Sequence, residues 1–326
     1  MFILSGDVGG TKTHLSLVDA NNPKIKIIDK KYPSQHFKNF SDIIIDFIHD
    51  KKEIVRACFG IAGPIKNNRC QTTNLPWNID ASDLCKILKT TEVHLINDLE
   101  ATAWGIPWLN STDIEYLNKG VLQQDSNMAL IAAGTGLGEA GLFWNGDRHI
   151  PFACEGGHVD FAATNEELWD LRTFLSLKYG HVSYERILSG PGLINIYEFL
   201  IKTGRYAKSK NDLLEINHEM QAQVIAENAL HNGCITCKHV LDIFVYIYGQ
   251  AAGNLALKFF SLSGLYIGGG IAPKILELMK TPLFMEGFTD KGRFRKLLEQ
   301  VPVKLIKNQD TALLGATRYA AKRSQS

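Results

Sequence analysis

The stretch GDVGGTKT, Gly6–Thr13, decides between two kinds of fold. It is close to the phosphate-binding motif G-x-x-x-x-G-K-[ST], but Thr11 stands where that motif has its second glycine. A P-loop leads into a helix. Here THLSLVD (13–19) follows, and Leu15 and Leu17 alternate with polar residues as in a strand. The stretch therefore predicts a strand, a glycine turn and a second strand.

Two readings of this turn remain open. Gly9 and Gly10 permit the positive φ angles of a tight hairpin, which would make the turn purely structural. The same residues let backbone N–H groups approach a ligand without a Cβ in the way, so the turn could also bind a phosphate.

Two further glycine-rich turns follow predicted strands. NMALIAAGTGLGEAGLFW (127–144) again predicts strand, turn and strand, and GLYIGGG (264–270) predicts a strand that ends in Gly268–Gly270. Open α/β sheets bind ligands at the carboxyl ends of their strands, so three such turns suggest a nucleotide site. GTGLG lacks the G-x-G-x-x-G spacing and precedes a strand, which argues against a dinucleotide fold.

The rest of the chain predicts an α/β protein in two parts, because strand and helix patterns alternate on both sides of an aperiodic stretch at 105–125. Strands are also expected at 26–33, 54–62, 92–97 and 302–306, and helices at 40–50, 81–89, 165–179, 190–202, 221–232, 237–261, 272–280 and 310–322.

The composition favours a small polar substrate. Among 326 residues, Lys plus Arg (35) nearly balances Asp plus Glu (34), so no basic field attracts nucleic acid or an anionic membrane. No run of about 18 consecutive apolar residues occurs, and Met1 leads directly into the first strand without a basic leader. We expect a cytoplasmic protein with no membrane or nucleic-acid partner.

The segment HNGCITCKH (231–239) contains cysteines and histidines that could bind a metal ion. A structural zinc site could use two cysteines and two histidines, but it normally separates its ligand pairs by an intervening module. Here the four candidates are crowded at the junction of two helix patterns, which favours helix-junction residues over ligands. The candidates are His231, Cys234, Cys237 and His239.

Polar residues gather after two other strands. Asn97 and Asp98 follow the strand EVHLIN, where one of them could cap a helix while the other faces a ligand. Glu155 and His158 share the loop CEGGHVDF, where they could bind a ligand or hydrogen-bond each other.

Together these motifs resemble the bacterial glucokinases of the actin-like ATPase superfamily, in order and spacing, over nearly the whole chain. The motifs are GDVGGTKT, FGIAGPI, TNLPW, INDLEA, GTGLGEA, EGGHVDF, ERILSGPGL, GGGIAP and DKGRF. Lys12 departs from the pattern, because close relatives often carry Asn there. A related group of sugar kinases and repressors usually has a cysteine-rich zinc motif soon after its histidine. None follows His158, so the chain resembles the zinc-free group.

The resemblance implies a two-lobed actin-like ATPase fold, ribonuclease H-like, with an inter-lobe cleft. The small α/β lobe would be residues 1–109, joined by the C-terminal helix 310–326, and the large α/β lobe residues 110–309. A homodimer is implied as well.

The resemblance also implies an activity and the residues that perform it. The activity is ATP-dependent phosphorylation of D-glucose at its 6-hydroxyl, with Mg²⁺ as a second cofactor, giving glucose 6-phosphate. Glucose would be bound by Asn97, Asp98, Glu155, His158 and Glu185, with Asp98 also the catalytic base. Asp7 would act on Mg²⁺ through water. The phosphates would lie on Gly9, Gly10, Thr11, Gly134, Thr135, Gly136 and Gly138, and the adenosine near Gly268 and Gly269.

Two alternatives remain. One is a kinase for another hexose, such as mannose or an amino sugar. The other is a sugar-responsive regulator on the same fold. Such regulators usually add an N-terminal DNA-binding helix-turn-helix, whereas here the first strand is expected at residue 2.

Overall fold

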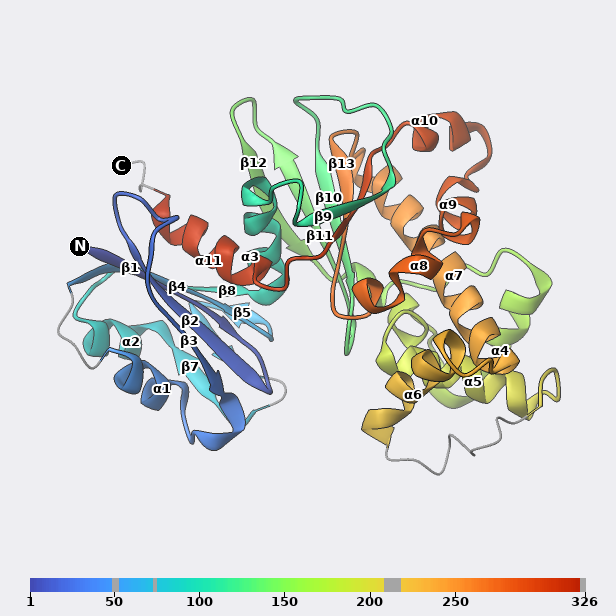
Figure 1. The fold of residues 1–326 in the computed structure, drawn as a ribbon, viewed down its shortest axis with the longest axis horizontal. Coiled ribbons are helices and arrows are strands. Elements are labelled where there is room, and N and C mark those ends of the chain that lie inside the picture. Colours follow the sequence, from blue (N-terminus) through green and yellow to red (C-terminus); the bar gives the residue numbers. More distant parts are fainter. Residues whose placement is uncertain (49–52, 73–74, 208–217, 323–326) are drawn as a thin grey trace. The chain divides into compact units, whose positions relative to one another are not determined.

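The structure is a computed structural model that describes residues 1–48, 53–72, 75–207 and 218–322 (Figure 1). The chain forms two compact units. Unit 1 comprises Met1–Asp113, Ile150–Ala153 and Asn308–Ser326, and unit 2 comprises Ile114–His149 and Cys154–Lys307. The two ends of the chain therefore belong to the same unit.

Unit 1 is built on a five-stranded sheet in the order β3-β2-β1-β4-β8 (Figure 1). Its strands are β1 (Phe2–Val8), β2 (Lys12–Asp19), β3 (Lys26–Pro33), β4 (Ile54–Ile61) and β8 (Val93–Asn97). β1, β2 and β3 form an antiparallel meander, and β4 and β8 extend the sheet in parallel to β1. The predicted strand, turn and strand at the N-terminus are confirmed, with Val8 opposite Thr13.

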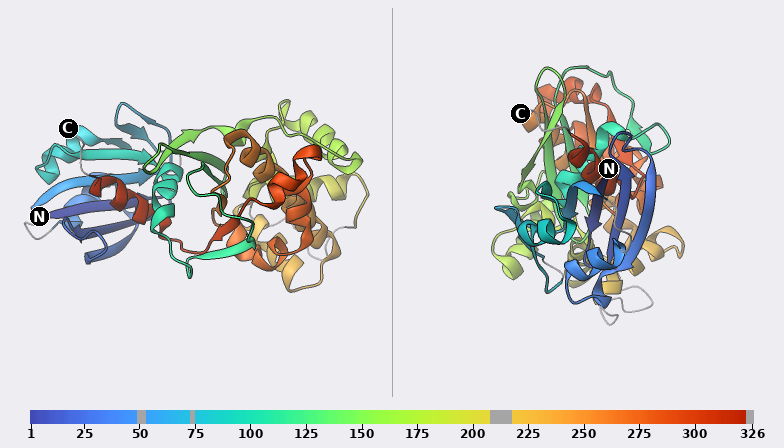
Figure 2. Two further views of the ribbon diagram at one scale, coloured as in Figure 1. Left: turned by 90° about the horizontal axis from the view of Figure 1, so that it is seen from above. Right: turned by 90° about the vertical axis from the view of Figure 1, so that its left-hand side faces the viewer.

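Helices cover both faces of this sheet, which explains why β1 is apolar on both sides. Leu4 packs in a cluster with residues of α1 (Phe40–Phe47) and α2 (Ala81–Leu88). The adjacent Ile3 packs on the other face, with residues of α3 (Asp98–Gly105) and α11 (Thr311–Ala321). Figures 1 and 2 show α11 lying along that face beside α3.

Glycines bring α3 and α11 close together. A Cβ at Gly315 on α11 would overlap the carbonyl oxygen of Ala101, and one at Gly105 on α3 would overlap that of Thr311. This contact fixes the N-terminal end of α11 in unit 1, and with it the residues just before that helix.

Several short elements carry too little periodicity to be predicted. Unit 1 has a small antiparallel sheet of β5 (Ile65–Lys66), β6 (Arg69–Gln71) and β7 (Asn78–Asp80). In the stretch expected to be aperiodic, β9 (Ile114–Asn118) pairs with β14 (Val303–Ile306). A strand is stable only when it pairs with another strand. The partner of β9 lies far along the chain, and the partners of β5, β6 and β7 are equally short, so a local pattern does not identify them.

Unit 2 repeats the plan of unit 1 on a six-stranded sheet in the order β12-β11-β10-β13-β14-β9. Its further strands are β10 (Met128–Ala133), β11 (Leu137–Trp144) and β13 (Gly264–Gly268). The edge strand β12 (His149–Cys154) belongs to the same sheet, although its residues Ile150–Ala153 are assigned to unit 1. β10 forms a hairpin with β11 and runs parallel to β13, which runs parallel to β14. The turns that follow β10 and β13 therefore lie at the same edge of the sheet. The predicted mixed α/β architecture is confirmed.

The other helices belong to unit 2. They are α4 (Glu166–Tyr179), α5 (Gly190–Lys202), α6 (His218–Leu230), α7 (Ile235–Phe259), α8 (Leu276–Met279), α9 (Pro282–Thr289) and α10 (Arg295–Glu299). The helix predicted at 272–280 is a 3-10 turn, Ala272–Ile275, followed by α8. α9 and α10 were not predicted. The helix predicted at 40–50 is α1, which ends at Phe47, and positions 49 and 50 lie outside the described residues.

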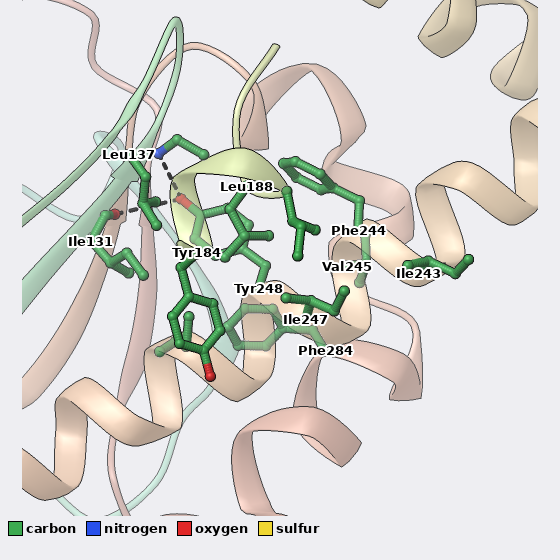
Figure 3. Close-up of a cluster of buried hydrophobic side chains, with 14 of the residues drawn as sticks. Ile131, Leu137, Tyr184, Leu188, Ile243, Phe244, Val245, Ile247, Tyr248 and Phe284 are labelled. Atoms are coloured by element: carbon green, nitrogen blue, oxygen red, sulfur yellow. Dashed lines mark hydrogen bonds between the residues drawn. The ribbon is translucent and has the colours of Figure 1, made fainter. Parts of the chain in front are cut away.

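α7 is the central helix of this unit. Its length and composition would suit a membrane span, but 78% of its most apolar window is buried within the protein. Figure 3 shows Phe244 and Tyr248 of α7 packed with Phe284 of α9. The apolar surface of α7 is therefore used for the core of unit 2.

Candidate active site

The β1–β2 turn offers backbone N–H groups. Gly9 donates its N–H to the Lys12 carbonyl at 3.0 Å, and Ser34 Oγ donates to the Gly9 carbonyl at 2.8 Å. Within the described chain, no backbone acceptor takes the N–H of Gly10 or Thr11. The expectation of positive φ angles is not met, because neither Gly9 nor Gly10 is among the described residues with positive φ. The turn can bind an anion without a left-handed backbone.

Asp7, at the end of β1, lies close to two other carboxylates. Burial raises the pKa of Asp7 to about 6, and the charges of Asp98 and Asp310 add to this rise, while Lys12 opposes it. The sequence analysis predicted Asp7 and Asp98 as site residues but missed Asp310. The packing of α11 brings Asp310 close to Asp7 on β1. No local sequence pattern predicts this proximity, because the two residues are far apart in the chain.

His14 holds Asp310 in this place. The imidazole is 3% exposed, its Nδ1 lies 3.2 Å from Asp310 Oδ1, and its Nε2 lies 3.1 Å from Asp29 Oδ1. The pKa of Asp29 is lowered by its hydrogen bond and charge interaction with His14, against the effect of burial. His14 thus links β2 to the start of α11 and fixes one member of the carboxylate group.

Asn97 and Asp98 meet at the start of α3, as a cap and a neighbouring carboxylate. Asn97 Oδ1 accepts the Leu99 N–H at 2.9 Å, and its Nδ2 donates to the Gly63 carbonyl at 3.2 Å. Asp98 Oδ1 accepts the same Leu99 N–H at 3.0 Å. Burial raises the pKa of the Asp98 carboxyl, and this hydrogen bond opposes the rise. Asn97 caps the helix, and Asp98 is a desolvated carboxylate at its first residue.

The turn Gly134–Gly138 in unit 2 rests on Glu185 and on α5. Gly190, the first residue of α5, donates its N–H to the Gly134 carbonyl at 2.9 Å. Leu137 donates its N–H to Glu185 Oε2 at 3.0 Å, and a Cβ at Gly136 would lie 2.5 Å from the same oxygen. Glu185 therefore supports the backbone of this turn, a role that the sequence analysis did not foresee.

One buried hydroxyl joins the strands that precede the second and third glycine turns. Tyr248 Oη accepts the Ala133 N–H at 3.1 Å and lies 3.4 Å from the Gly268 carbonyl oxygen. It also lies 3.5 Å from the Ile131 carbonyl oxygen (Figure 3). Gly269 adopts φ +83°, and a Cβ there would overlap the Ala133 carbonyl. Tyr248 was missed from the sequence because it lies among apolar residues of α7, where a tyrosine is an ordinary core residue.

His158 lies between two carboxylates. Its Nε2 is 3.9 Å from Glu155 Oε2, and its Nδ1 is 3.9 Å from Glu185 Oε1. These distances exceed a hydrogen bond, so the loop residues do not satisfy each other. The side chains of Glu155 and His158 are 87% and 60% exposed, and that of Glu185 is 28% exposed. The structure brings together the three side chains that the sequence analysis predicted in this unit.

A third carboxylate, Glu139 on β11, lies beneath this loop and was missed. It is 4% exposed, and a Cβ at Gly156 would overlap its Oε2. Burial raises the pKa of Glu139, against the charge of Lys258. Only a glycine at position 156 lets the loop pass over this carboxyl group.

Among the described residues, no group of three or more His, Cys, Asp or Glu side chains could hold a metal ion. In the segment singled out for zinc, His239 Nε2 lies 2.9 Å from Glu167 Oε1, and its ring stacks on Tyr206 at 4.8 Å between centroids. His231 is exposed at the end of α6.

The arrangement within each unit suits a distinct task. Unit 1 combines backbone N–H groups that no backbone acceptor takes with partly buried carboxylates. Unit 2 combines glycine turns with a carboxylate–imidazole–carboxylate group in which Glu155 and His158 are exposed and Glu185 is half-buried. Such a group can donate to and accept from the hydroxyls of a polar ligand.

Comparison with known proteins identifies one family. The family model described as glucokinase matches residues 4–323. The chain is 37% identical to the glucokinase of a Nostoc species over an alignment of 343 residues, covering 98% of this chain and 99% of the relative.

Solved structures agree with this match. The crystal structure of a glucokinase from an Antarctic psychrotroph has a TM-score of 0.85 at 29% identity, covering 98% of both chains. The fold is also similar to that of the Balamuthia mandrillaris glucokinase in complex with glucose, with a TM-score of 0.82 at 23% identity over 98% of this chain and 94% of the other. The predicted actin-like ATPase fold is confirmed.

Proposed function

Because this chain belongs to the glucokinase family and is an ATP-dependent glucose kinase, we propose that Asp98 is the general base of its phosphoryl transfer. The observation that carries this proposal is the environment of Asp98. Its carboxyl is fixed by the Leu99 N–H at the end of a strand, and burial raises its pKa. A fixed, desolvated carboxylate is a good acceptor for the proton of the glucose 6-hydroxyl.

In phosphoryl transfer, catalysis depends on the alignment of the phosphoryl donor and the acceptor hydroxyl more than on covalent steps by the protein. As the γ-phosphoryl group arrives, the 6-hydroxyl oxygen forms the new bond to phosphorus and passes its proton to Asp98, while the bond from the γ-phosphorus to the β,γ-bridging oxygen breaks and ADP leaves. The Leu99 N–H holds the carboxylate in one orientation during the transfer. General-base catalysis of this type is typically worth roughly 10²–10⁴-fold.

We propose that glucose is bound by Asn97, Glu155, His158 and Glu185 together with Asp98. Carboxylates, an amide and an imidazole provide the donors and acceptors that vicinal hydroxyls need. Two observations support this role for Glu155 and His158. Both side chains are exposed, and at 3.9 Å they do not hydrogen-bond each other, so their polar atoms can bind a ligand.

For ATP, the proposed phosphate contacts are backbone N–H groups of the first two glycine turns, and the third turn would lie near the adenosine. The residues are Gly9, Gly10, Thr11, Gly134, Thr135, Gly136, Gly138, Gly268 and Gly269. The N–H groups of Gly10 and Thr11 support this, because no backbone acceptor in the described chain takes them.

A divalent cation would be attracted to Asp7, because burial raises the pKa of this carboxyl and the charges of Asp98 and Asp310 raise it further. We propose that Asp7 interacts with Mg²⁺ through water. Mg²⁺ supplies the positive charge that neutralises the phosphates of ATP.

We further propose a cytoplasmic homodimer with no nucleic-acid or membrane partner. The near-equal numbers of basic and acidic residues support the last two points, because no basic field attracts nucleic acid or an anionic membrane. The predicted lobes 1–109 with 310–326, and 110–309, remain the proposed functional division. Light scattering after size exclusion tests the dimer.

The function is tested by a coupled kinase assay with ATP and Mg²⁺ over glucose, mannose, glucosamine, galactose and fructose. We expect the highest kcat/KM for glucose. A kcat/KM for mannose or the amino sugar that exceeds the glucose value would instead identify a kinase for that hexose. Glucose binding by isothermal titration calorimetry without turnover of any sugar would favour a regulator.

A further inference from the structure

Two thiols meet at the start of α7, outside the residues of the proposed active site. Cys234 is the residue that caps α7, and Cys237 is in its first turn. Their Sγ atoms are 2.7 Å apart, although both cysteines are free. Non-bonded heavy atoms usually stay about 3.5–4.0 Å apart. The two sulfurs are therefore closer than an ordinary packing contact.

The backbone arranges this approach. Residues three apart lie on one side of a helix, so the C-x-x-C spacing places both side chains on the same side. Cys234 occupies the capping position, where its Sγ accepts the Cys237 N–H at 3.2 Å, in the way that a Ser or Asp oxygen usually does. The cap contact orients Sγ of Cys234 toward the first turn and its second thiol.

The two thiols differ in access to solvent. Cys234 is half-buried and sits at the positive end of a 25-residue helix, where negative charge is favoured. Cys237 is 0% exposed, and burial raises the pKa of its thiol. An external reagent can therefore reach Cys234 first, and Cys237 can react only with its neighbour.

A metal is the competing occupant of a cysteine pair. The histidine nearest in sequence on α7, His239, is engaged with Glu167 and Tyr206. No third ligand accompanies the pair among the described residues. The geometry thus favours chemistry between the two sulfurs.

We propose that Cys234 and Cys237 form a redox-active dithiol that exchanges with low-molecular-weight disulfides such as oxidised glutathione. The Cys234 thiolate attacks one sulfur of the disulfide, whose S–S bond breaks, and the departing thiolate takes up a proton. Cys237 then loses its proton and attacks Cys234 Sγ, expelling the second thiolate. Two protein thiols are oxidised to one disulfide while one external disulfide is reduced to two thiols.

The test equilibrates the reduced full-length protein with oxidised glutathione, quenches with acid, and alkylates the remaining thiols. Mass spectrometry then reads the tryptic fragment 211–238, which holds both cysteines. We expect this fragment to lose two hydrogens and to escape alkylation. Internal controls are the single half-buried thiols Cys85 and Cys154, which should form adducts roughly tenfold less readily.

Two variants separate the roles. Cys237→Ser should retain glutathione as a stable adduct on Cys234, because the thiol that expels it is gone. Cys234→Ser should leave Cys237 unmodified and available for alkylation after denaturation.

Three results would overturn the proposal. The first is a wild-type fragment 211–238 that stays fully reduced under these conditions. The second is equal adduct formation in the two variants. The third is Zn²⁺ that remains bound to the wild type through gel filtration but not to Cys234→Ser, which would make the pair a metal ligand.

Discussion

Replacing Asp7 by asparagine should make the ligand-free protein more stable near neutral pH and almost inactive as a kinase. The pKa of Asp7 rises from its ordinary 3.8 to about 6, through burial and the charges of Asp98 and Asp310. Folding therefore penalises the ionised form of this carboxyl. Asparagine has nearly the same shape and carries no charge, so it removes the penalty.

The sign follows from the direction of the shift. At a pH below 3.8, Asp7 is protonated in both the folded and the unfolded state, so folding carries no penalty from this carboxyl and its contribution to stability is fully present. As the pH rises through 3.8, the unfolded chain ionises first, and the contribution is lost progressively until the folded carboxyl also ionises at about pH 6. One pKa unit equals about 1.4 kcal/mol, which gives a penalty of about 1 kcal/mol at about pH 4.5 and about 3 kcal/mol at about pH 7.5.

The assay is urea unfolding of the wild type and Asp7→Asn at both pH values, in EDTA and without nucleotide. The free energy of unfolding of Asp7→Asn should exceed that of the wild type by about 2 kcal/mol more at the higher pH than at the lower one. Asp147→Asn, in an exposed turn, is the matched control and should shift stability by less than about 0.5 kcal/mol at either pH.

Equal differences between Asp7→Asn and the wild type at the two pH values would refute the electrostatic reasoning. So would a variant that is less stable than the wild type at about pH 7.5. Activity is a separate readout of the proposed magnesium role, and a folded Asp7→Asn enzyme with wild-type kcat would contradict that role alone.

Five other substitutions test the site. Asp98→Asn should lower kcat by at least about 100-fold while glucose binds within about tenfold of wild type; a folded variant that keeps more than about a tenth of wild-type kcat would exclude Asp98 as the base. His158→Ala should weaken glucose binding alone, whereas Glu185→Ala should weaken both glucose and ATP because it also removes the acceptor for the Leu137 N–H. Calorimetry with each ligand distinguishes the two, and identical profiles would contradict the dual role of Glu185. Tyr248→Phe leaves the buried Ala133 N–H without its acceptor, so stability should fall by about 1–3 kcal/mol and the KM for ATP should rise without a change in glucose affinity. Unchanged thermal unfolding and ATP kinetics would show that this hydroxyl supports neither turn. Gly10→Val should raise the KM for ATP or lower kcat in a folded protein, and wild-type ATP kinetics would make the first turn purely structural.

The positions of the glycine turns and of the main strands could be predicted because they depend on local chemistry. Leu15 and Leu17 alternate with polar residues, so the segment after Gly9 and Gly10 had to be a strand, and β2 confirms this. Asn97 is a good helix cap by its side chain alone, and it caps α3. Such features need only the preferences of a residue and its neighbours.

The short strands show where local patterns fail. β9 is stable because it pairs with β14. Almost the whole of unit 2 lies between these two strands in the sequence. A five-residue segment with mixed burial has no clear period of two. Its conformation is decided by a partner that the pattern does not identify.

By itself, the sequence determined that this protein has glycine turns between strands, capped helices and the ordered motifs of a glucose kinase. Only the tertiary structure decided that Asp310 approaches Asp7, that the Tyr248 hydroxyl joins β10 to β13, and that Glu185 supports a turn. These contacts join residues that are far apart in the chain. They form because buried surfaces must pack closely and buried N–H groups and carboxylates must find partners, and neither requirement leaves a period or a motif in the sequence.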